Sequence, residues 1–107
     1  MSGAQVKVGL EARRDLRKLV LWLRDNADAQ TATKFAKAAI AGFDKIVVSP
    51  GIGPVIPTAH PALIGLRKWW VPGFRNHLVF YRRIDSGIEV VRVLHAAQDW
   101  WALLDIN

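Results

Sequence analysis

The chain has 107 residues, of which 51% are hydrophobic, and a formal net charge of +6. This length and apolar content fit one folded domain, residues 1–107, and exclude a disordered chain. Because the chain contains no cysteine, a disulfide framework and thiolate metal sites are excluded as well.

The excess of basic residues bears on the partners of the protein. A chain of this charge is expected to bind nucleic acid, an acidic protein or a ribonucleoprotein, and charge alone does not choose between them. Five tryptophans in so short a chain indicate large buried contacts or an interface. No apolar run has the length of a membrane span, and the N-terminus lacks the pattern of a signal peptide. We therefore expect a cytoplasmic protein with no membrane partner.

The N-terminal segment predicts a short strand followed by a helix. In residues 5–10, Val6, Val8 and Leu10 alternate with other residues, which is typical of a strand with one buried face. Residues 11–26 carry apolar side chains at helical spacing, and these form one stripe: Ala12, Leu16, Leu19, Val20 and Leu23. We interpret the basic residues of this helix as a solvated face. A contact with phosphate or with an acidic protein is the alternative.

A second helix is predicted from Asp28, its N-cap, to about Val48. The residues of its expected core face recur at helical spacing: Phe35, Ala39, Phe43 and Ile46, with Ala36, Ile40 and Val47 beside them. Its alanines favour helix and permit close approach to the first helix, so an αα-hairpin is expected.

A long irregular connection is predicted over residues 49–63, because its prolines and glycines exclude helix and strand interiors. Loops of this length are often functional. His60 lies in this loop, and no second His, Asp or Glu stands nearby at metal-ligand spacing. No metal site and no cofactor are therefore predicted.

The most informative stretch runs from Leu66 to Trp100. Its β-branched and aromatic residues predict strands over residues 66–71, 74–84 and 88–95. Pro72-Gly73 and Asp85-Ser86-Gly87 fit two tight turns between them. The three predicted strands and their turns, residues 66–95, contain six basic residues against two acidic ones, so +4 of the net charge of +6 belongs to this predicted meander.

Together these elements predict an α+β fold in the order β-αα-βββ. A small, mostly antiparallel sheet would be packed on one face by the αα-hairpin, with the first strand beside the last strand of the meander. Because strand neighbours point to opposite faces, Trp69 and Trp70 cannot both face the helices, and Phe80 and Tyr81 behave likewise. The other face is expected to be thinly covered, aromatic and basic, and therefore open to a partner. The apolar tail from residue 96 would pack back on the domain or cover a partner.

The segment HLVFYRRIDSGIEVVRVLHAAQDW, residues 77–100, combines a strand ending in Tyr-Arg, an Asp/Gly turn and a valine-rich strand ending in Val-Leu-His. Together with Ser49-Pro50-Gly51 after the second helix, it resembles the RelE/ParE family of toxins from bacterial type II toxin–antitoxin modules. The resemblance extends from Val6 to about Trp101. It implies a cytoplasmic toxin that is neutralised in a hetero-oligomer by an acidic, ParD-like or similar antitoxin, whose C-terminal segment folds while wrapping the toxin.

In this family, RelE-like members cut mRNA on the ribosome, whereas ParE-like members inhibit DNA gyrase. RNA cleavage needs a base, an acid and cations for the phosphate, and the candidates here are Lys68, Arg75, Arg83 and His95. RelE-like ribonucleases usually carry a C-terminal tyrosine or a His-Tyr pair, whereas the single tyrosine of this chain is Tyr81, in the middle strand. This difference favours the ParE-like branch: a non-enzymatic gyrase inhibitor without a small-molecule substrate.

For that function the expected contacts with the target or the antitoxin are Trp69, Trp70, Arg75, Tyr81, Arg82, Arg83, Trp100 and Trp101. Besides the endoribonuclease, a non-catalytic nucleic-acid-binding module and an inactive toxin remain as alternatives. His77 and His95 have side chains that titrate near neutrality. Their structural interpretation is that His95 ends a strand, bonded to local backbone, and that His77 packs on the sheet.

Overall fold

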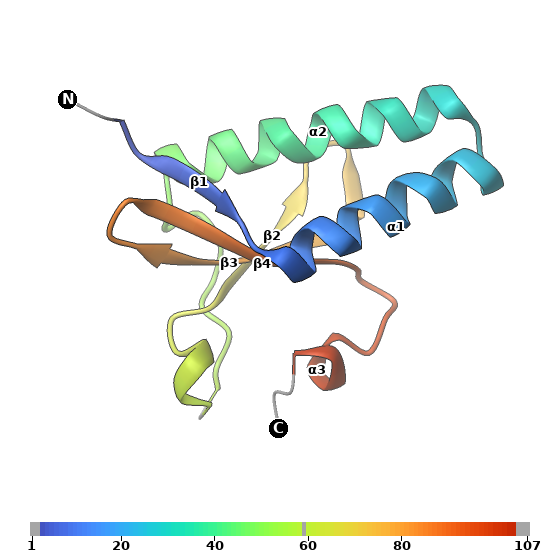
Figure 1. Ribbon diagram of the computed structural model, residues 1–107. Coiled ribbons are helices and arrows are strands. Elements are labelled where there is room, and N and C mark those ends of the chain that lie inside the picture. The colour runs from blue at the N-terminus through green and yellow to red at the C-terminus, as the bar shows by residue number, and fades with distance from the viewer. Residues whose placement is uncertain (1–2, 59, 105–107) are drawn as a thin grey trace.

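The structure is a computed structural model that describes residues 3–58 and 60–104. Two long helices, α1 (Leu10–Asn26) and α2 (Ala29–Val48), lie on one side of a four-stranded sheet (Figure 1). The remaining elements are β1 (Gln5–Val8), the 3-10 helix η1 (Pro61–Leu63), β2 (Arg67–Val71), β3 (Phe74–Ile84), β4 (Gly87–His95) and α3 (Trp100–Leu103). The predicted α+β fold in the order β-αα-βββ is therefore confirmed. In the described part of the chain, no helix has the length and apolar character needed to cross a bilayer.

The sheet has the strand order β1-β4-β3-β2. Strands β2, β3 and β4 form the predicted antiparallel meander, and β1 pairs in parallel with β4, as expected for the first strand. Gly87 begins β4 with φ 149°, a conformation that L side chains rarely adopt. A Cβ atom at this position would collide with the backbone oxygen of Gln5. Glycine at position 87 thus permits both the turn and the close approach of β1.

The first strand is shorter than predicted. It ends at Val8, and the backbone N–H of Gly9 donates to the carbonyl of Val90 at 2.9 Å before the chain leaves the sheet. Leu10 is the first residue of α1 and is 64% exposed. The prediction that Leu10 continues the buried face of the strand is therefore wrong. At the next helix start the predicted cap is present, since Asp28 accepts a hydrogen bond from the Thr31 N–H at 2.6 Å.

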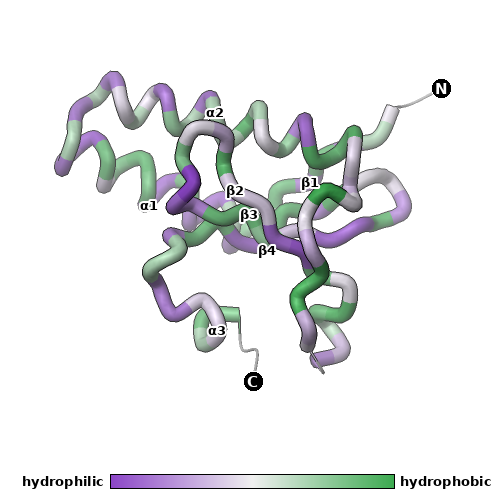
Figure 2. Tube along the Cα trace, turned by 180° about the vertical axis from the view of Figure 1, so that it is seen from behind, coloured by the Kyte–Doolittle hydropathy of each residue, from purple (hydrophilic) through white to green (hydrophobic). Residues whose placement is uncertain are grey.

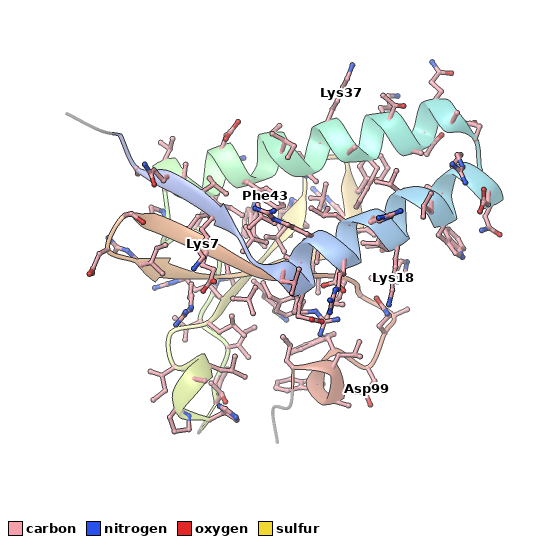
Figure 3. The ribbon with its side chains drawn as sticks, viewed as in Figure 1. Lys7, Lys18, Lys37, Phe43 and Asp99 are labelled. Atoms are coloured by element: carbon pink, nitrogen blue, oxygen red, sulfur yellow. The ribbon has the colours of Figure 1, made fainter. Side chains whose placement is uncertain are left out.

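The helices and one face of the sheet enclose the larger core. Along both helices hydrophobic and hydrophilic residues alternate at helical spacing (Figure 2). In Figure 3, Phe43 points from α2 toward the sheet, whereas Lys37 points away from it. The predicted core residues of α2 are buried: Phe35, Ala39, Phe43 and Ile46. Ile40, however, is 54% exposed, so its predicted place beside the core is wrong.

A second, smaller core covers the opposite face of the sheet. Its buried residues come from the loop after α2, from the strands and from the tail: Ile56, Leu66, Phe80, Leu94 and Leu104. The tail packs back on the domain, and the ring of Trp100 lies 5.4 Å from that of Phe80. The prediction that this face is thinly covered is therefore wrong. The loop after α2 and the C-terminal tail cover this face. No periodic pattern in these segments indicates that they do so.

The free part of the β4 edge is closed by α1. Strand β1 pairs with β4 only as far as Val90, and beyond this point Asp15 of α1 accepts the N–H of Val93 at 3.0 Å. The same carboxylate binds Arg92 through two hydrogen bonds, of 2.7 and 2.9 Å. Arg92 also donates to the carbonyl of Leu103 at 3.3 Å. This group of contacts ties α1, β4 and α3 together.

Candidate functional site

Aromatic and basic side chains gather on β2, which forms one edge of the sheet. Trp69 packs against the larger core, whereas Trp70 is 37% exposed, as the strand alternation predicts. Their rings nevertheless stack at 4.0 Å, next to the register shift between Trp70 and Val71. The guanidinium of Arg75 lies over the ring of Trp70 at 5.4 Å, a distance that suits a cation–π contact.

A second cation–aromatic group lies on the other core. The ammonium of Lys68 lies 4.8 Å from the centre of the Trp100 ring, and Trp100 stacks on Trp101 at 4.0 Å. Trp101 is 44% exposed. Because Lys68 and Trp70 are two residues apart on one strand, they share a face of the sheet. We call Lys68, Trp70, Arg75, Trp100 and Trp101 the aromatic–cation surface.

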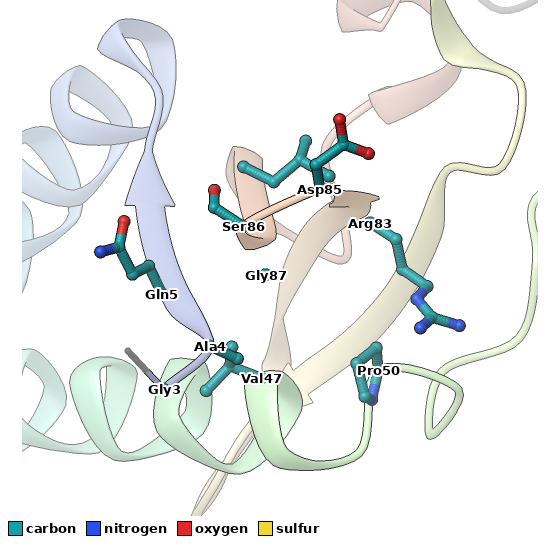
Figure 4. A pocket seen from close by; sticks show the side chains of 10 residues that line it. Gly3, Ala4, Gln5, Val47, Pro50, Arg83, Asp85, Ser86 and Gly87 are labelled. Atoms are coloured by element: carbon teal, nitrogen blue, oxygen red, sulfur yellow. The ribbon is translucent and has the colours of Figure 1, made fainter. Parts of the chain in front are cut away.

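Arg82 and Arg83 do not belong to this surface. Arg82 donates to Glu89 on the neighbouring strand, with a shortest distance of 2.7 Å. Arg83 lines a hollow of about 470 Å³ between the N-terminal segment, the end of α2 and the β3–β4 turn (Figure 4). Arg75 and Arg83 are eight positions apart on β3, which corresponds to roughly 26 Å along an extended strand. The predicted contact residues therefore do not form one continuous surface.

Tyr81 is fully buried and serves the fold. Its hydroxyl donates to the carbonyl of Pro50 at 2.7 Å and accepts the N–H of Gly53 at 3.0 Å. Burial raises the pKa of this phenol above its ordinary value. The side chain holds the loop after α2 against the sheet and is not part of the molecular surface.

His77 and His95 face each other across β3 and β4. Their ring centres lie 5.0 Å apart, at an interplanar angle of 80°. Nδ1 of His95 accepts the backbone N–H of Ala97 at 3.0 Å, and His77 packs on Phe35 with ring centres 4.8 Å apart. Burial, and then the proximity of His95, lower the pKa of His77. Both histidines thus have the contacts that their structural interpretation predicts.

The four residues of the endoribonuclease hypothesis do not form one group, although Lys68 and Arg75 both belong to the aromatic–cation surface. Lys68 covers Trp100, Arg75 covers Trp70, Arg83 lines the hollow at the far end of β3, and His95 faces His77. A base, an acid and a cation must reach one phosphodiester together. This arrangement offers no single place at which the four side chains meet. Within residues 3–58 and 60–104, no group of three or more His, Cys, Asp or Glu side chains is placed to hold a metal ion.

Two features were not predicted from the sequence. The sequence did indicate the ion pair of Asp15 and Arg92, because Asp15 lies on the apolar stripe of α1. It stands three residues after Ala12 and four before Leu19. An acid at such a position requires a buried partner. The other feature is a cavity beside Trp22, which had no signal, because its walls come from three distant segments.

The fold and the aromatic–cation surface define a small basic domain of the β-αα-βββ type. The family model described as "ParE toxin of type II toxin-antitoxin system, parDE" matches residues 6–100. The chain therefore belongs to the ParE toxin family of type II toxin–antitoxin systems.

A solved structure has the same fold. It is titled "Chromosomal ParDE TA system from P. aeruginosa", and it matches with a TM-score of 0.66 over 86% of this chain and 95% of that chain. The two sequences are 16% identical, so this likeness concerns the fold alone. No curated protein matches the sequence at a significant level.

Proposed function

We propose that this protein is the toxin of a type II toxin–antitoxin module, that it inhibits DNA gyrase by binding, and that an acidic antitoxin neutralises it. The observation that carries this proposal is the separation of the candidate catalytic residues. Lys68 and Arg75 cover tryptophan rings, and Arg83 lies at the other end of β3. Inhibition by binding requires a stable domain and an exposed contact surface, and it needs no convergent acid, base and cation.

The aromatic–cation surface is the proposed contact with gyrase. Tryptophan and arginine are enriched among the residues that dominate binding energies at protein interfaces. Trp70 and Trp101 are 37% and 44% exposed although each stacks on a second indole. The cation over each pair limits the motion of the rings, so little conformational freedom is lost when a partner covers them.

The antitoxin proposal is supported by family membership and charge. The net charge of the chain is +6, and the solved structure of similar fold is titled as a ParDE toxin–antitoxin system. A basic toxin attracts an acidic partner over long range, which speeds association and makes it sensitive to salt. We expect the gene beside this one to encode an acidic protein that binds the chain tightly.

The first test of the proposal compares two activities of the purified protein. We expect the protein to inhibit supercoiling by purified gyrase and to leave mRNA on translating ribosomes intact by primer extension. Trp70→Ala should weaken the inhibition, whereas Arg83→Ala, at the other end of β3, should retain it. Cut mRNA with normal supercoiling would instead support the endoribonuclease alternative, and an inert protein in both assays would contradict both activities.

A further inference from the structure

A cavity of about 410 Å³ lies under the second half of α1 and is distinct from the aromatic–cation surface. Leu19 and Trp22 of α1 form one wall, and His77, His95 and Gln98 form the other. Lys18 also lines the cavity, and its side chain points from α1 to the side on which α3 lies (Figure 3). We call this cavity the α1 cavity. Its size falls in the range of about 300–1,000 Å³ that is usual for ligand sites.

The exposure of the Trp22 side chain in this wall is not explained by the packing of the domain. Its side chain is 60% exposed, although the neighbouring Leu23 is buried in the larger core. A large exposed aromatic residue at the mouth of a cavity is typical of a residue that a partner covers.

One residue of the α1 cavity wall, His77, has a polar atom without a hydrogen-bond partner in the described part of the chain. His77 is 8% exposed, and the atom is its buried Nδ1. Buried polar atoms are paired in most native structures, so an unpaired one calls for an explanation. An occupant that brings a hydrogen-bonding group, met by a small rotation of the imidazole, would remove this deficit.

The charge of the lining selects the kind of partner. Lys18 is the charged residue among the described side chains that line the cavity, and no carboxylate is among them. The occupant therefore belongs to an acidic segment and not to a basic one. Its buried part is apolar, because Leu19 and the rings of Trp22, His77 and His95 form most of the walls.

We propose that the α1 cavity receives an aromatic side chain, tryptophan or tyrosine, from an acidic segment of the antitoxin. Such a side chain combines an apolar ring with one polar group, which matches apolar walls that carry imidazole and amide groups. The imidazoles of His77 and His95 already meet edge to face, the arrangement that aromatic rings prefer. This inference rests on the proposed function, since it assigns the antitoxin a particular anchor on the toxin.

The first experiment measures binding of the acidic protein encoded beside this chain. Trp22→Ala should weaken the complex by roughly thirtyfold in isothermal titration, as expected for a central interface anchor. Because Trp22 is 60% exposed, this change leaves the core intact. Lys18→Glu should also weaken binding, and the loss should shrink at high salt.

The matched control is Ile40→Ala. Ile40 is 54% exposed and lines an apolar hollow on the other side of α1, so its loss should change the affinity less than about threefold. If the complex forms and Trp22→Ala binds as tightly as the unchanged chain, the anchor is overturned while the toxin–antitoxin proposal stands.

A second experiment tests the cavity without any antitoxin. N-acetyl-L-tryptophan, titrated into the purified chain, should produce saturable shifts of the His77 and His95 ring signals in NMR spectra, and Trp22→Ala should abolish them. N-acetyl-L-aspartate, which lacks the ring, should produce none. Saturation by N-acetyl-L-leucine alone would overturn the aromatic occupant. Absence of any saturable shift would overturn the site, and so would shifts that depend only on protein concentration, which indicate a second copy of the chain.

Discussion

At the scale of single residues, Asp15 joins three elements through one carboxylate. It accepts two hydrogen bonds from Arg92 and one from the backbone of Val93, while Arg92 reaches the carbonyl of Leu103. Hydrogen bonding to Asp15 raises the pKa of Arg92 further above its already high value. Both side chains are largely buried, 9% exposed for Asp15 and 17% for Arg92. Removal of one partner therefore leaves the charge of the other largely buried and unpaired.

Asp15→Ala is expected to lower the free energy of unfolding by about 3–5 kcal/mol, since it leaves the Arg92 charge without its ion-pair partner and the Val93 N–H without a hydrogen-bond acceptor. Urea denaturation followed by circular dichroism measures this loss. The control is Asp25→Ala, which removes an exposed pair with Arg24 and should cost less than about 1 kcal/mol. Equal midpoints for the two variants would contradict the role of Asp15.

His77 is expected to make the stability depend on pH. Its pKa in the folded chain is lowered from the ordinary 6.5 by burial and by His95, so the unfolded chain binds more protons below pH 6.5. The free energy of unfolding should therefore fall as the pH drops from 7 through 6.5 toward the lowered pKa. Lys18 lines the same cavity, and a proton on His77 would add to its positive charge.

This pH dependence is measured by urea midpoints between pH 7.5 and 5. His77→Phe should flatten the profile in this window, whereas His60→Gln, a change in the exposed loop, should leave it as it is. A profile that is equally steep in the His77 variant would assign the effect to other groups.

The residues that could be predicted from sequence are those that one periodic element determines. The stripe of α1, the core face of α2 and the Asp28 cap depend on local spacing, and the structure has them where spacing places them, with Ile40 as the exception. Tyr81, by contrast, was expected at a contact surface because of its type. It is buried because the hydroxyl binds Pro50 and Gly53, which are about thirty positions away and carry no periodic signal.

At the scale of elements, the loop between α2 and β2 covers the second core. Its Gly53 approaches β2 so closely that a Cβ atom there would collide with the carbonyl of Lys68. The Gly53 carbonyl accepts the Arg67 guanidinium at 2.6 Å, and Ile56 bonds Leu66 through the backbone at 2.8 Å. These contacts explain how a proline-rich segment whose only helical turn in the described residues is η1 closes the second core.

Tyr81→Phe is expected to loosen this loop. Loss of the hydroxyl leaves the buried Gly53 N–H and the Pro50 carbonyl without their partner, at a cost of about 1–3 kcal/mol. Limited proteolysis should then cut faster within residues 49–66. Thr33→Ala, which removes an exposed hydroxyl from α2, should leave the cleavage rate unchanged. Equal rates for both variants would mean that Tyr81 does not hold the loop.

The order and type of the elements could be predicted from sequence, because periods of 3.6 and 2 residues and the two glycine turns are local signals. The cover of the second sheet face could not. It depends on long-range contacts of Ile56, Leu66 and Leu104, residues of irregular segments in which no period indicates the buried side. The aromatic and basic residues consequently remain at the rim of the sheet and do not spread over an open face.

At the scale of the whole molecule, two cores share one sheet, so the strands are buried on both faces. Val93 is 1% exposed in the larger core and lies beside the Asp15 carboxylate through its backbone N–H. The free energy of unfolding of such a domain is only about 5–15 kcal/mol. One unpaired charge buried in this strand is therefore expected to unfold the whole domain.

Val93→Asp is expected to abolish cooperative folding. The change loses about 1.5–3 kcal/mol of apolar transfer energy and buries an unpaired carboxylate next to Asp15. Thermal melting followed by circular dichroism tests it. Val48→Asp makes the same replacement at a position that is 81% exposed and should preserve the transition. A sharp, unshifted transition in the Val93 variant would mean that β4 is wrongly placed.

The arrangement of the five tryptophans should give the protein a distinctive circular dichroism spectrum. Four of them form two stacked pairs with ring centres 4.0 Å apart, and Trp22 stands apart on α1. Indoles at this distance couple electronically, so each pair should contribute a couplet of opposite-signed bands to the circular dichroism spectrum. Replacement of either member should remove that couplet. Binding at the sheet rim should therefore change these couplets, whereas binding at α1, beside Trp22, should leave them unchanged.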